Sequence, residues 1–238
     1  MRVAMWSGPR NLSTAMMYSF ASRNDCTVWD EPFYAAYLAA TGLIHPMTKE
    51  ILAAGITNAT DVGAACLAEI PDGKTLFYQK HMTQHMLPQF NRDWMSSFRN
   101  VFLIRHPAKV LASYRAKREN PTFDDIGFWQ QAEIFQQIQK TTGKTPTVID
   151  SDDILADPEK MLGRLCNALG IPFNRQMLTW PKGPHIKDGA WAPHWYKSVW
   201  ESDGFSKKPT AEPDFSGLPD EILEKSMRCY RDLHKYRL

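Results

Sequence analysis

A short loop at residues 8–14 carries the residue types that bind anions. Gly8 permits a tight backbone path, and Arg10 adds a permanent, forked positive charge. Ser13 and Thr14 supply hydroxyl and N–H groups at the point where an apolar helical run begins. Since the free N–H groups and the positive end of a helix dipole face the preceding loop, these residues predict a site for a polyanion.

The same loop also fits a plainer interpretation, in which Gly8 and Pro9 form a turn and a Ser or Thr caps the helix. The nucleotide-binding pattern G-x-x-x-x-G-K-[ST] is not matched. Leu12 and Ser13 stand where the second Gly would fall, and no Lys precedes Thr14. An ordinary nucleoside triphosphatase is therefore disfavoured.

Polar residues also follow other strand-like runs. Arg105 ends an apolar run and Ser113 lies about two turns into the next helical run, so both are predicted to hold one phosphate. Glu31 and His81 are predicted at the ends of two further strands, and ligands bind beyond the carboxyl ends of strands in open α/β sheets. Taken singly, Arg105 also fits a solvated strand end and Ser113 a hydroxyl bonded to its own helix.

Alternating strand-like and helix-like runs must position these groups, and this alternation predicts an α/β fold with a mainly parallel sheet covered on both faces. We expect one domain over residues 1–238. Residues 180–217 are dense in Pro, Gly, Trp and Lys, and are predicted to form one long ordered loop. Strands are predicted at 2–6, 27–30, 75–79, 101–105 and 147–150, and helices at 13–22, 33–40, 61–69, 82–90, 108–118, 124–141, 158–169 and 219–236.

Composition narrows the class of protein. The chain has 238 residues, 43% of them hydrophobic, and its net charge of +2 is too small to predict a nucleic-acid partner. No segment approaches the roughly 18 apolar residues of a membrane span, and no leader-like apolar stretch follows Met1. The histidines form no metal-binding pattern. Widely separated cysteines indicate reduced thiols in a cytoplasmic protein. They are Cys26, Cys66, Cys166 and Cys229.

Three segments together resemble the sulfotransferase family: loop 8–14, the spacing of Arg105, Pro107 and Ser113, and residues 151–158 leading into 165–172. The resemblance implies a three-layer sandwich of the P-loop type. It also implies that the donor is 3′-phosphoadenosine-5′-phosphosulfate and that the product is adenosine 3′,5′-bisphosphate. No metal is implied.

The resemblance assigns residues to each end of this donor. Arg105 and Ser113 match the pair that holds the 3′-phosphate, and Lys182, Gly183 and Trp191 match a late loop that closes over the nucleotide. The 5′-phosphosulfate would be held by loop 8–14, through Gly8, Arg10, Asn11, Ser13 and Thr14. Where the family has a Lys and a Gly in this loop, the chain has Arg10 and Leu12. The Leu12 side chain must therefore point away from the phosphate.

Segments 30–32 and 188–193 also resemble a bacterial and plant subgroup whose plant members carry names borrowed from branched-chain aminotransferases. Nothing in the sequence suggests a pyridoxal phosphate site.

The implied reaction is in-line attack by a hydroxyl or amine of a small acceptor on the sulfonate, and it needs a base. His81 matches the catalytic His of small-molecule members, and Glu31 resembles the catalytic Glu of other members; both stay open. Glu31 requires a pKa raised by burial. Arg10 would neutralise the leaving group, and Lys80 would assist its bridging oxygen.

Two other classes of function stay open at this point. One is a P-loop kinase or nucleotide hydrolase, and the other is a non-catalytic nucleotide-binding protein on the same scaffold. The acceptor pocket is expected around residues 34–60 and 120–135, whose composition names neither an acceptor nor an oligomeric state.

Overall fold

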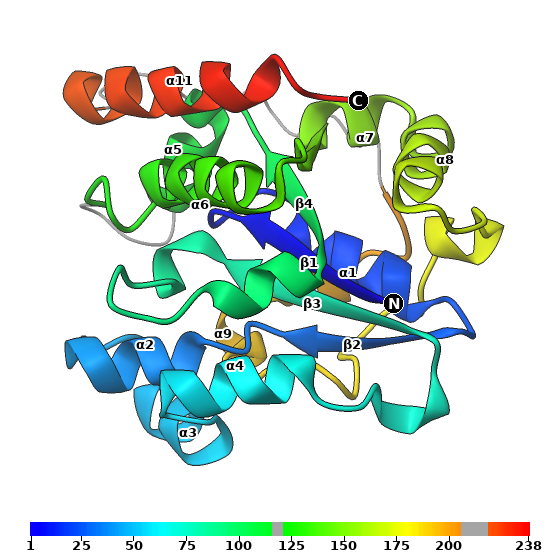
Figure 1. Ribbon diagram of the computed structural model, residues 1–238, viewed down its shortest axis with the longest axis horizontal. Helices are drawn as coiled ribbons and strands as arrows, with labels where there is room; N and C mark the ends of the chain where they lie inside the picture. The colour runs from blue at the N-terminus through cyan, green and yellow to red at the C-terminus, as the bar shows by residue number, and fades with distance from the viewer. Residues whose placement is uncertain (116–120, 206–218) are drawn as a thin grey trace.

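The computed structural model describes residues 1–115, 121–205 and 219–238, and its centre is a five-stranded parallel sheet (Figure 1). The strand order is β2-β3-β1-β4-β5, and every neighbouring pair runs parallel. The predicted α/β sandwich and its five strands are confirmed. The strands are β1 (Arg2–Ser7), β2 (Cys26–Asp30), β3 (Leu76–Met82), β4 (Arg99–Ile104) and β5 (Thr147–Asp150).

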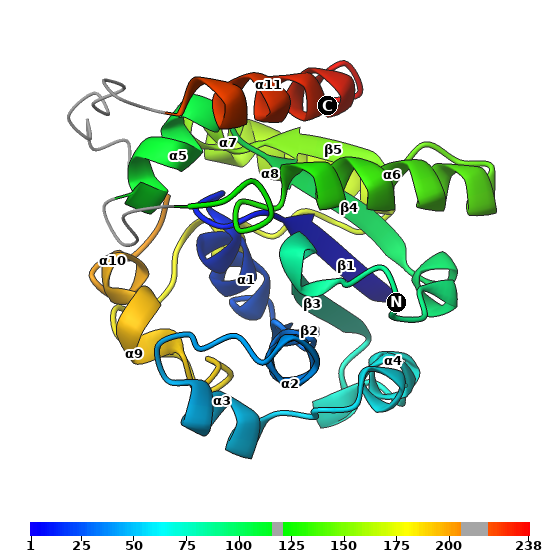
Figure 2. The same ribbon diagram turned by 90° about the vertical axis from the view of Figure 1, so that its left-hand side faces the viewer.

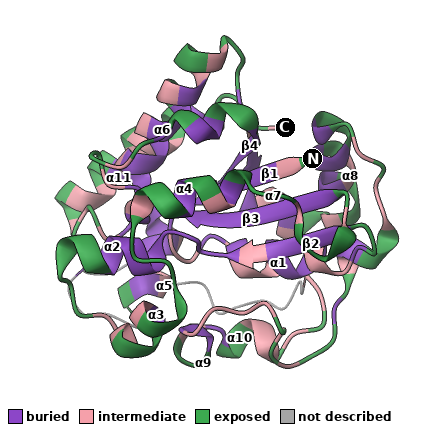
Figure 3. Cartoon of the chain, turned by 60° about the horizontal axis from the view of Figure 1, so that its bottom comes forward, coloured by how far each residue is buried: buried purple, intermediate pink, exposed green. Residues whose placement is uncertain are grey.

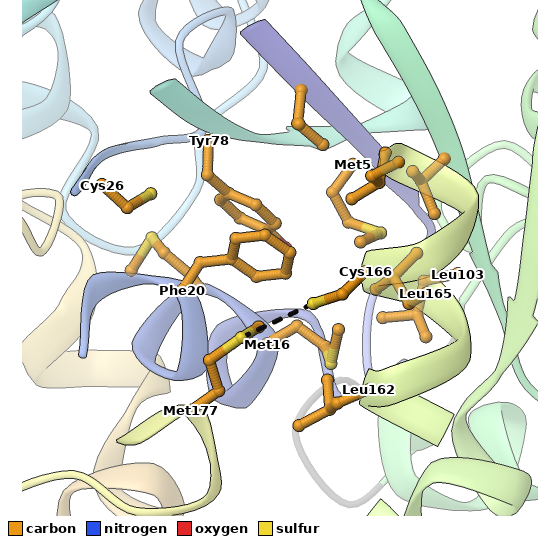
Figure 4. Packing of buried hydrophobic residues seen from close by; sticks show 14 of the residues in the cluster. Met5, Met16, Phe20, Cys26, Tyr78, Leu103, Leu162, Leu165, Cys166 and Met177 are labelled. Carbon is orange, nitrogen blue, oxygen red and sulfur yellow. Dashed lines mark hydrogen bonds between the residues drawn. The ribbon is translucent and has the colours of Figure 1, made fainter. Parts of the chain in front are cut away.

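Helices cover both faces of this sheet, which is why the strands read as continuous apolar runs (Figures 2 and 3). Helices α1 (Ser13–Ala21) and α8 (Pro158–Leu169) pack on one face, in the cluster drawn in Figure 4. The opposite face is covered by α4 (Ala59–Leu67), α6 (Phe128–Thr142) and α11 (Asp220–His234).

The path of the chain creates a switch point beside β1. From β1 the chain passes to the edge strand β2 and returns to β3, and it then crosses to β4 on the other side of β1. The segments that follow β1 and β4 therefore start side by side at the carboxyl edge of the sheet. Ligands bind at such a position in open α/β folds.

One predicted helix is wrong. Residues 82–90 do not form a helix, because β3 continues to Met82, which pairs with Ser7 of β1. A single 3₁₀ turn, Thr83–His85, follows the strand. His81 therefore lies inside β3 and not in the segment after it.

Other elements differ in extent from the prediction. The remaining helices are α2 (Tyr34–Thr41), α3 (Thr48–Ala54), α5 (Pro107–Arg115), α7 (Ser151–Ala156), α9 (Ala192–Trp195) and α10 (Lys197–Trp200). Helices α3 and α7 are too short to show apolar periodicity, and α9 and α10 are single turns within the expected loop at 180–217. Residues 116–118 of the predicted helix 108–118, and residues 206–217 of that loop, lie outside the described residues.

Within the described ranges no single helix is long and apolar enough to cross a membrane, although one bent pair, Thr48–Ala54 with Ala59–Gly73, meets that criterion when taken together. All four cysteines are free thiols. Cys229 is half-buried and the other three are buried.

Candidate active site

The loop between β1 and α1 has a strained backbone. Arg10 and Leu12 adopt φ angles of 63° and 71°, in the left-handed region that favours glycine. The Leu12 side chain packs against the apolar cluster beneath α1, so it points away from the loop. No side chain caps α1, which leaves the first-turn N–H groups for another partner.

Two contacts hold this loop against its neighbours. A Cβ atom at Gly8 would lie 2.5 Å from the carbonyl oxygen of Ile126, so only glycine allows the close approach. The Asn11 side-chain amide donates to the carbonyl of Leu103 at 3.3 Å, which ties the loop to β4. The Asn11 Oδ1 atom is buried without a hydrogen-bond partner among the described residues.

Arg10, Arg105 and Ser113 meet beside this loop. Arg10 Nε donates to Ser113 Oγ at 3.0 Å, and Arg105 Nη1 donates to the Arg10 carbonyl at 2.8 Å. The structure thus brings Arg105 and Ser113, the pair predicted to share one phosphate, to the arginine of the loop at residues 8–14. Leu12, Ser13 and Thr14 continue from the same loop into α1.

The two guanidinium groups repel each other. Burial lowers the pKa of Arg10, and the nearby charge of Arg105 lowers it further. Burial also lowers the pKa of Arg105, although Asp152 and Asp150 oppose this effect from a distance. In the part of the chain that the structure describes, neither guanidinium has a carboxylate within ion-pair distance, and Arg105 Nε is buried without a partner. A bound anion would satisfy both groups.

A second polar group surrounds Lys80 at the carboxyl end of β2. The Lys80 ammonium donates to Asp30 at 2.9 Å, to Glu31 Oε1 at 2.5 Å and to the Tyr196 hydroxyl at 2.7 Å. Tyr196 in turn donates to Asp30 Oδ2 at 2.7 Å. All three donors of the ammonium are therefore used inside the protein, and none is left for a ligand oxygen.

This network leaves one excess negative charge when both carboxyl groups are ionised. Burial raises the pKa of Glu31 to about 6; the Lys80 ammonium opposes the rise, and the Asp30 carboxylate adds to it. The Glu31 backbone is strained as well, with φ at 38°. Glu31 can therefore take up and release a proton near neutral pH.

The segment at residues 188–196 completes the network. Trp191 Nε1 donates to the Tyr196 hydroxyl at 2.9 Å, and the Gly189 N–H donates to Asp30 Oδ2 at 3.1 Å. A Cβ atom at Gly189 would overlap the Trp191 ring, so glycine is needed for the indole to lie over the backbone. Trp191 is thus buried beside Lys80 and Glu31.

Lys182 and Gly183 lie elsewhere on the late segment. Lys182 is 63% exposed and faces Asp203 at 3.6 Å, and the Gly183 N–H donates to the carbonyl of Trp200. Across the described ranges, neither residue forms a hydrogen bond or ion pair with Arg10 or Arg105. The role of Lys182 and Gly183 in covering a nucleotide stays a prediction.

His81 points into the apolar core on the α4 and α6 face of the sheet. Its ring stacks on Trp6 with centroids 4.6 Å apart, and Trp94 and Phe33 flank it. Burial lowers the pKa of His81 to about 3. The Lys80 side chain leaves β3 on the other face, because successive side chains alternate along a strand. His81 and Lys80, which holds Glu31, therefore point to opposite faces of the sheet.

A different histidine, His85, faces Glu31. Its Nδ1 atom lies 3.8 Å from Glu31 Oε2, and its ring stacks with those of Tyr34 and Tyr37. Burial lowers the pKa of His85 well below its ordinary value, so it is neutral and forms no ion pair with Glu31.

Sequence reasoning gave no role to His85 or Asp30. Only Asp30 left a signal. It is a charged residue at the end of an apolar strand, and it stands level with Lys80 in the register of β2 and β3.

Comparisons with known proteins agree with this architecture. The family model described as "Sulfotransferase domain" matches residues 1–237. Two curated proteins of Arabidopsis thaliana, named branched-chain-amino-acid aminotransferase-like proteins 1 and 2, are 38% and 36% identical over 97% and 96% of this chain. The chain spans 41% and 40% of their lengths.

Solved structures show the same fold. The sulfotransferase domain of the Synechococcus PCC 7002 olefin synthase has a TM-score of 0.57 at 15% identity, and the match covers 96% of this chain and 94% of that domain. A sulfotransferase from Alicyclobacillus acidocaldarius has a TM-score of 0.54 at 11% identity, over 99% of this chain and 96% of its own.

Proposed function

Because the chain belongs to the sulfotransferase domain family, we propose that it transfers a sulfonate group from 3′-phosphoadenosine-5′-phosphosulfate to a hydroxyl or amine of a small acceptor. One observation carries the proposal. Arg10 and Arg105 are partly buried together at the carboxyl edge of the sheet, without a carboxylate in ion-pair distance among the described residues. Such a site favours a bound anion.

The two ends of the donor have distinct partners in this proposal. Arg105 and Ser113 hold the 3′-phosphate, which ATP lacks. The 5′ end lies against the uncapped start of α1, where the helix dipole and backbone N–H groups favour negative charge. The buried, unpartnered donor Arg105 Nε supports an anionic ligand here. Gly8, Ser13 and Thr14 complete the 5′ site.

We assign the role of base to Glu31. Its pKa of about 6 and its place at the carboxyl edge support this choice, whereas His81 is buried among aromatic rings with a pKa of about 3. Two strand spacings of about 4.8 Å separate β2 from β1. The acceptor therefore approaches the sulfonate from the β2 side, opposite the charge of Arg10.

The transfer step balances with these residues alone. The acceptor oxygen or nitrogen forms a bond to sulfur and gives its proton to Glu31. The bond between sulfur and the bridging phosphate oxygen breaks, and its electron pair stays on adenosine 3′,5′-bisphosphate, where Arg10 stabilises the added charge. Lys80 positions Glu31 and does not assist the bridging oxygen, because its three donors are already used.

Radiolabelled donor tests this proposal with a panel of alcohols, phenols and amines. Transfer should persist in excess chelator and should decline as the pH falls through about 6, because Glu31 must be ionised to accept a proton. Glu31→Gln should lower kcat by about 10²- to 10⁴-fold while leaving bisphosphate binding intact.

His81→Phe is the competing variant, because it removes the other base predicted from the sequence and keeps an aromatic ring against Trp6. If Glu31→Gln keeps wild-type turnover while His81→Phe abolishes it, the assignment of the base is wrong. Transfer that disappears in chelator and returns with Mg²⁺ would instead favour a kinase-like reaction.

A further inference from the structure

The two carboxylate oxygens of Glu31 have different surroundings. Oε1 accepts from Lys80, and the Tyr196 hydroxyl lies 3.4 Å from it. Oε2 makes no hydrogen bond to any described residue, and the nearest polar atom recorded for it is His85 Nδ1 at 3.8 Å. Since Lys80 holds Oε1, the oxygen that can take a proton from an acceptor is Oε2.

His85 presents a matching polar atom that nothing in the described chain satisfies. Its side chain is only 4% exposed, and Nδ1 is buried without a hydrogen-bond partner. Tyr34 and Tyr37 both stack with the ring, with centroids 4.3 Å and 4.9 Å away, and these contacts restrain the imidazole. A buried polar atom left unpaired in a rigid setting indicates a missing partner.

The distance between the two atoms fits one bridging group. At 3.8 Å they are too far apart for a direct hydrogen bond, but a single oxygen can lie about 2.8 Å from each of them. The spacing of Glu31 Oε2 and His85 Nδ1 therefore fits one hydroxyl oxygen between them.

The Glu31 carboxylate also decides which ring nitrogen of His85 carries the proton. The charged and titratable groups around this ring are Glu31, Lys80, His45 and His81. His45, Lys80 and His81 keep His85 neutral, together with burial, and the facing Glu31 oxygen favours the tautomer that carries its proton on Nδ1. The pair then offers one hydrogen-bond acceptor, Glu31 Oε2, and one donor, His85 Nδ1–H.

We propose that Glu31 Oε2 and His85 Nδ1–H together hold the nucleophilic oxygen of the acceptor, which makes the acceptor an alcohol or a phenol. A hydroxyl donates to Glu31 and accepts from His85, so it matches both groups. A neutral amine has a single lone pair, so a nitrogen that accepts from His85 has no lone pair left to attack sulfur. This inference rests on the proposed transfer reaction and narrows its acceptor to hydroxyl compounds.

During transfer the hydroxyl proton moves to Glu31 Oε2 as the oxygen forms its bond to sulfur. The His85 proton stays on Nδ1 throughout and orients the oxygen. The bond from sulfur to the 5′-phosphate oxygen breaks, and its electron pair leaves with the bisphosphate. No further reactant is required.

The first test needs no acceptor. In protein carrying ¹⁵N-labelled histidine, the His85 signals are identified by their loss in His85→Phe, which keeps a ring between the two tyrosines. A neutral imidazole protonated at Nδ1 above about pH 6, where Glu31 is ionised, is the expected result. A neutral imidazole protonated at Nε2, or a doubly protonated one, overturns the proposal.

The second test compares 2-naphthol with 2-naphthylamine, which differ only in the nucleophilic group. Radiolabelled sulfonate should pass to 2-naphthol in preference to 2-naphthylamine, and His85→Phe should lower kcat/KM for 2-naphthol by about 10- to 100-fold. His85→Asn, which restores a donor near the position of Nδ1, should recover part of the loss. If His85 had only a structural role, His85→Phe would lower kcat/KM equally for both acceptors. That result contradicts the proposal, and so does a preference of the wild-type protein for the amine.

Bisphosphate binding separates this inference from the one on which it rests. His85→Phe should bind adenosine 3′,5′-bisphosphate with wild-type affinity, because His85 lies on the Glu31 side of the site. If the wild-type protein itself fails to bind the bisphosphate, the proposed transfer reaction fails, while the tautomer measurement still decides the state of His85.

Discussion

The hydroxyl of Tyr78 is buried in the apolar cluster beneath α1 without a hydrogen-bond partner among the described residues. Such a group loses its bonds to water on folding and gains nothing in return. Tyr78→Phe should therefore raise the free energy of unfolding by about 1 kcal/mol, measured by urea denaturation. The ring contact with Phe20, at 4.5 Å between centroids, is preserved by this change.

Tyr18 provides the matched control, because its hydroxyl donates to Asp188 at 2.7 Å and accepts from Trp200. Tyr18→Phe should lower the free energy of unfolding by about 1–3 kcal/mol. Equal destabilisation by both substitutions would show that the Tyr78 hydroxyl is hydrogen-bonded in solution.

The side chain of Leu12 stabilises the fold, whereas its backbone conformation destabilises it. Its side chain packs on the core, while its φ of 71° costs an L-residue about 1 kcal/mol. Comparing Leu12→Gly with Leu12→Ala isolates the backbone, because both remove the apolar contact. The glycine variant should be more stable by about 1 kcal/mol in chemical denaturation.

In an ordinary helix, glycine should be less stable than alanine, which is the opposite of the order expected at Leu12. Ala64 is exposed in the middle of α4, and Ala64→Gly should cost about 1 kcal/mol. If Leu12→Gly is instead less stable than Leu12→Ala, the loop before α1 does not hold the left-handed conformation in solution.

At the scale of elements, the segment at 188–196 is joined to the end of β2 through Asp30, which accepts from the Gly189 N–H and the Tyr196 hydroxyl. Gly189→Ala would place a methyl group inside the space of the Trp191 ring, so the indole must move away from Tyr196. We expect a loss of about 1–3 kcal/mol in the free energy of unfolding, with a change in tryptophan fluorescence.

Gly163 is the control for this substitution. It lies in α8, and a methyl group at this position would meet no atom within 4 Å, so Gly163→Ala should stabilise the protein by about 0.5–1 kcal/mol. An unperturbed fluorescence spectrum in Gly189→Ala would contradict the contact between Gly189 and Trp191.

Much of the arrangement of elements follows from the sequence, because every strand of a parallel sheet ends at the same edge. Whatever the strand order, the loop after β1 and the residue after β4 had to share that edge, and Arg10 and Arg105 do meet there. Side-chain contacts that depend on where a strand ends could not be predicted from the sequence. Since faces alternate along a strand, the extension of β3 from residue 79 to Met82 decides where His81 points.

The Lys80 network was beyond sequence reasoning for a related reason. Lys80 contacts Asp30 only because β2 and β3 are neighbours, and strand order is a property of the whole sheet. Tyr196 enters from an aperiodic segment, where no repeat indicates which side chains turn inward. The carboxyl edge could thus be predicted, whereas the partners of Glu31 could not.

At the scale of the whole molecule, the sheet holds two charged sites along its carboxyl edge, with opposite electrostatic character. The arginine site beside β1 and β4 favours an anion, and the Glu31 site beside β2 carries excess negative charge. In the proposed reaction, the donor lies on one side of the reacting sulfur and the base on the other.

Calorimetric titration with adenosine 3′,5′-bisphosphate and ADP tests the central claim most directly, since only the first ligand carries a 3′-phosphate. The wild-type protein should prefer the bisphosphate, and Arg105→Ala should weaken that ligand by about 2–5 kcal/mol while changing ADP binding much less. Equal binding of the two ligands by the wild-type protein, or an equal loss for both in Arg105→Ala, would contradict the account.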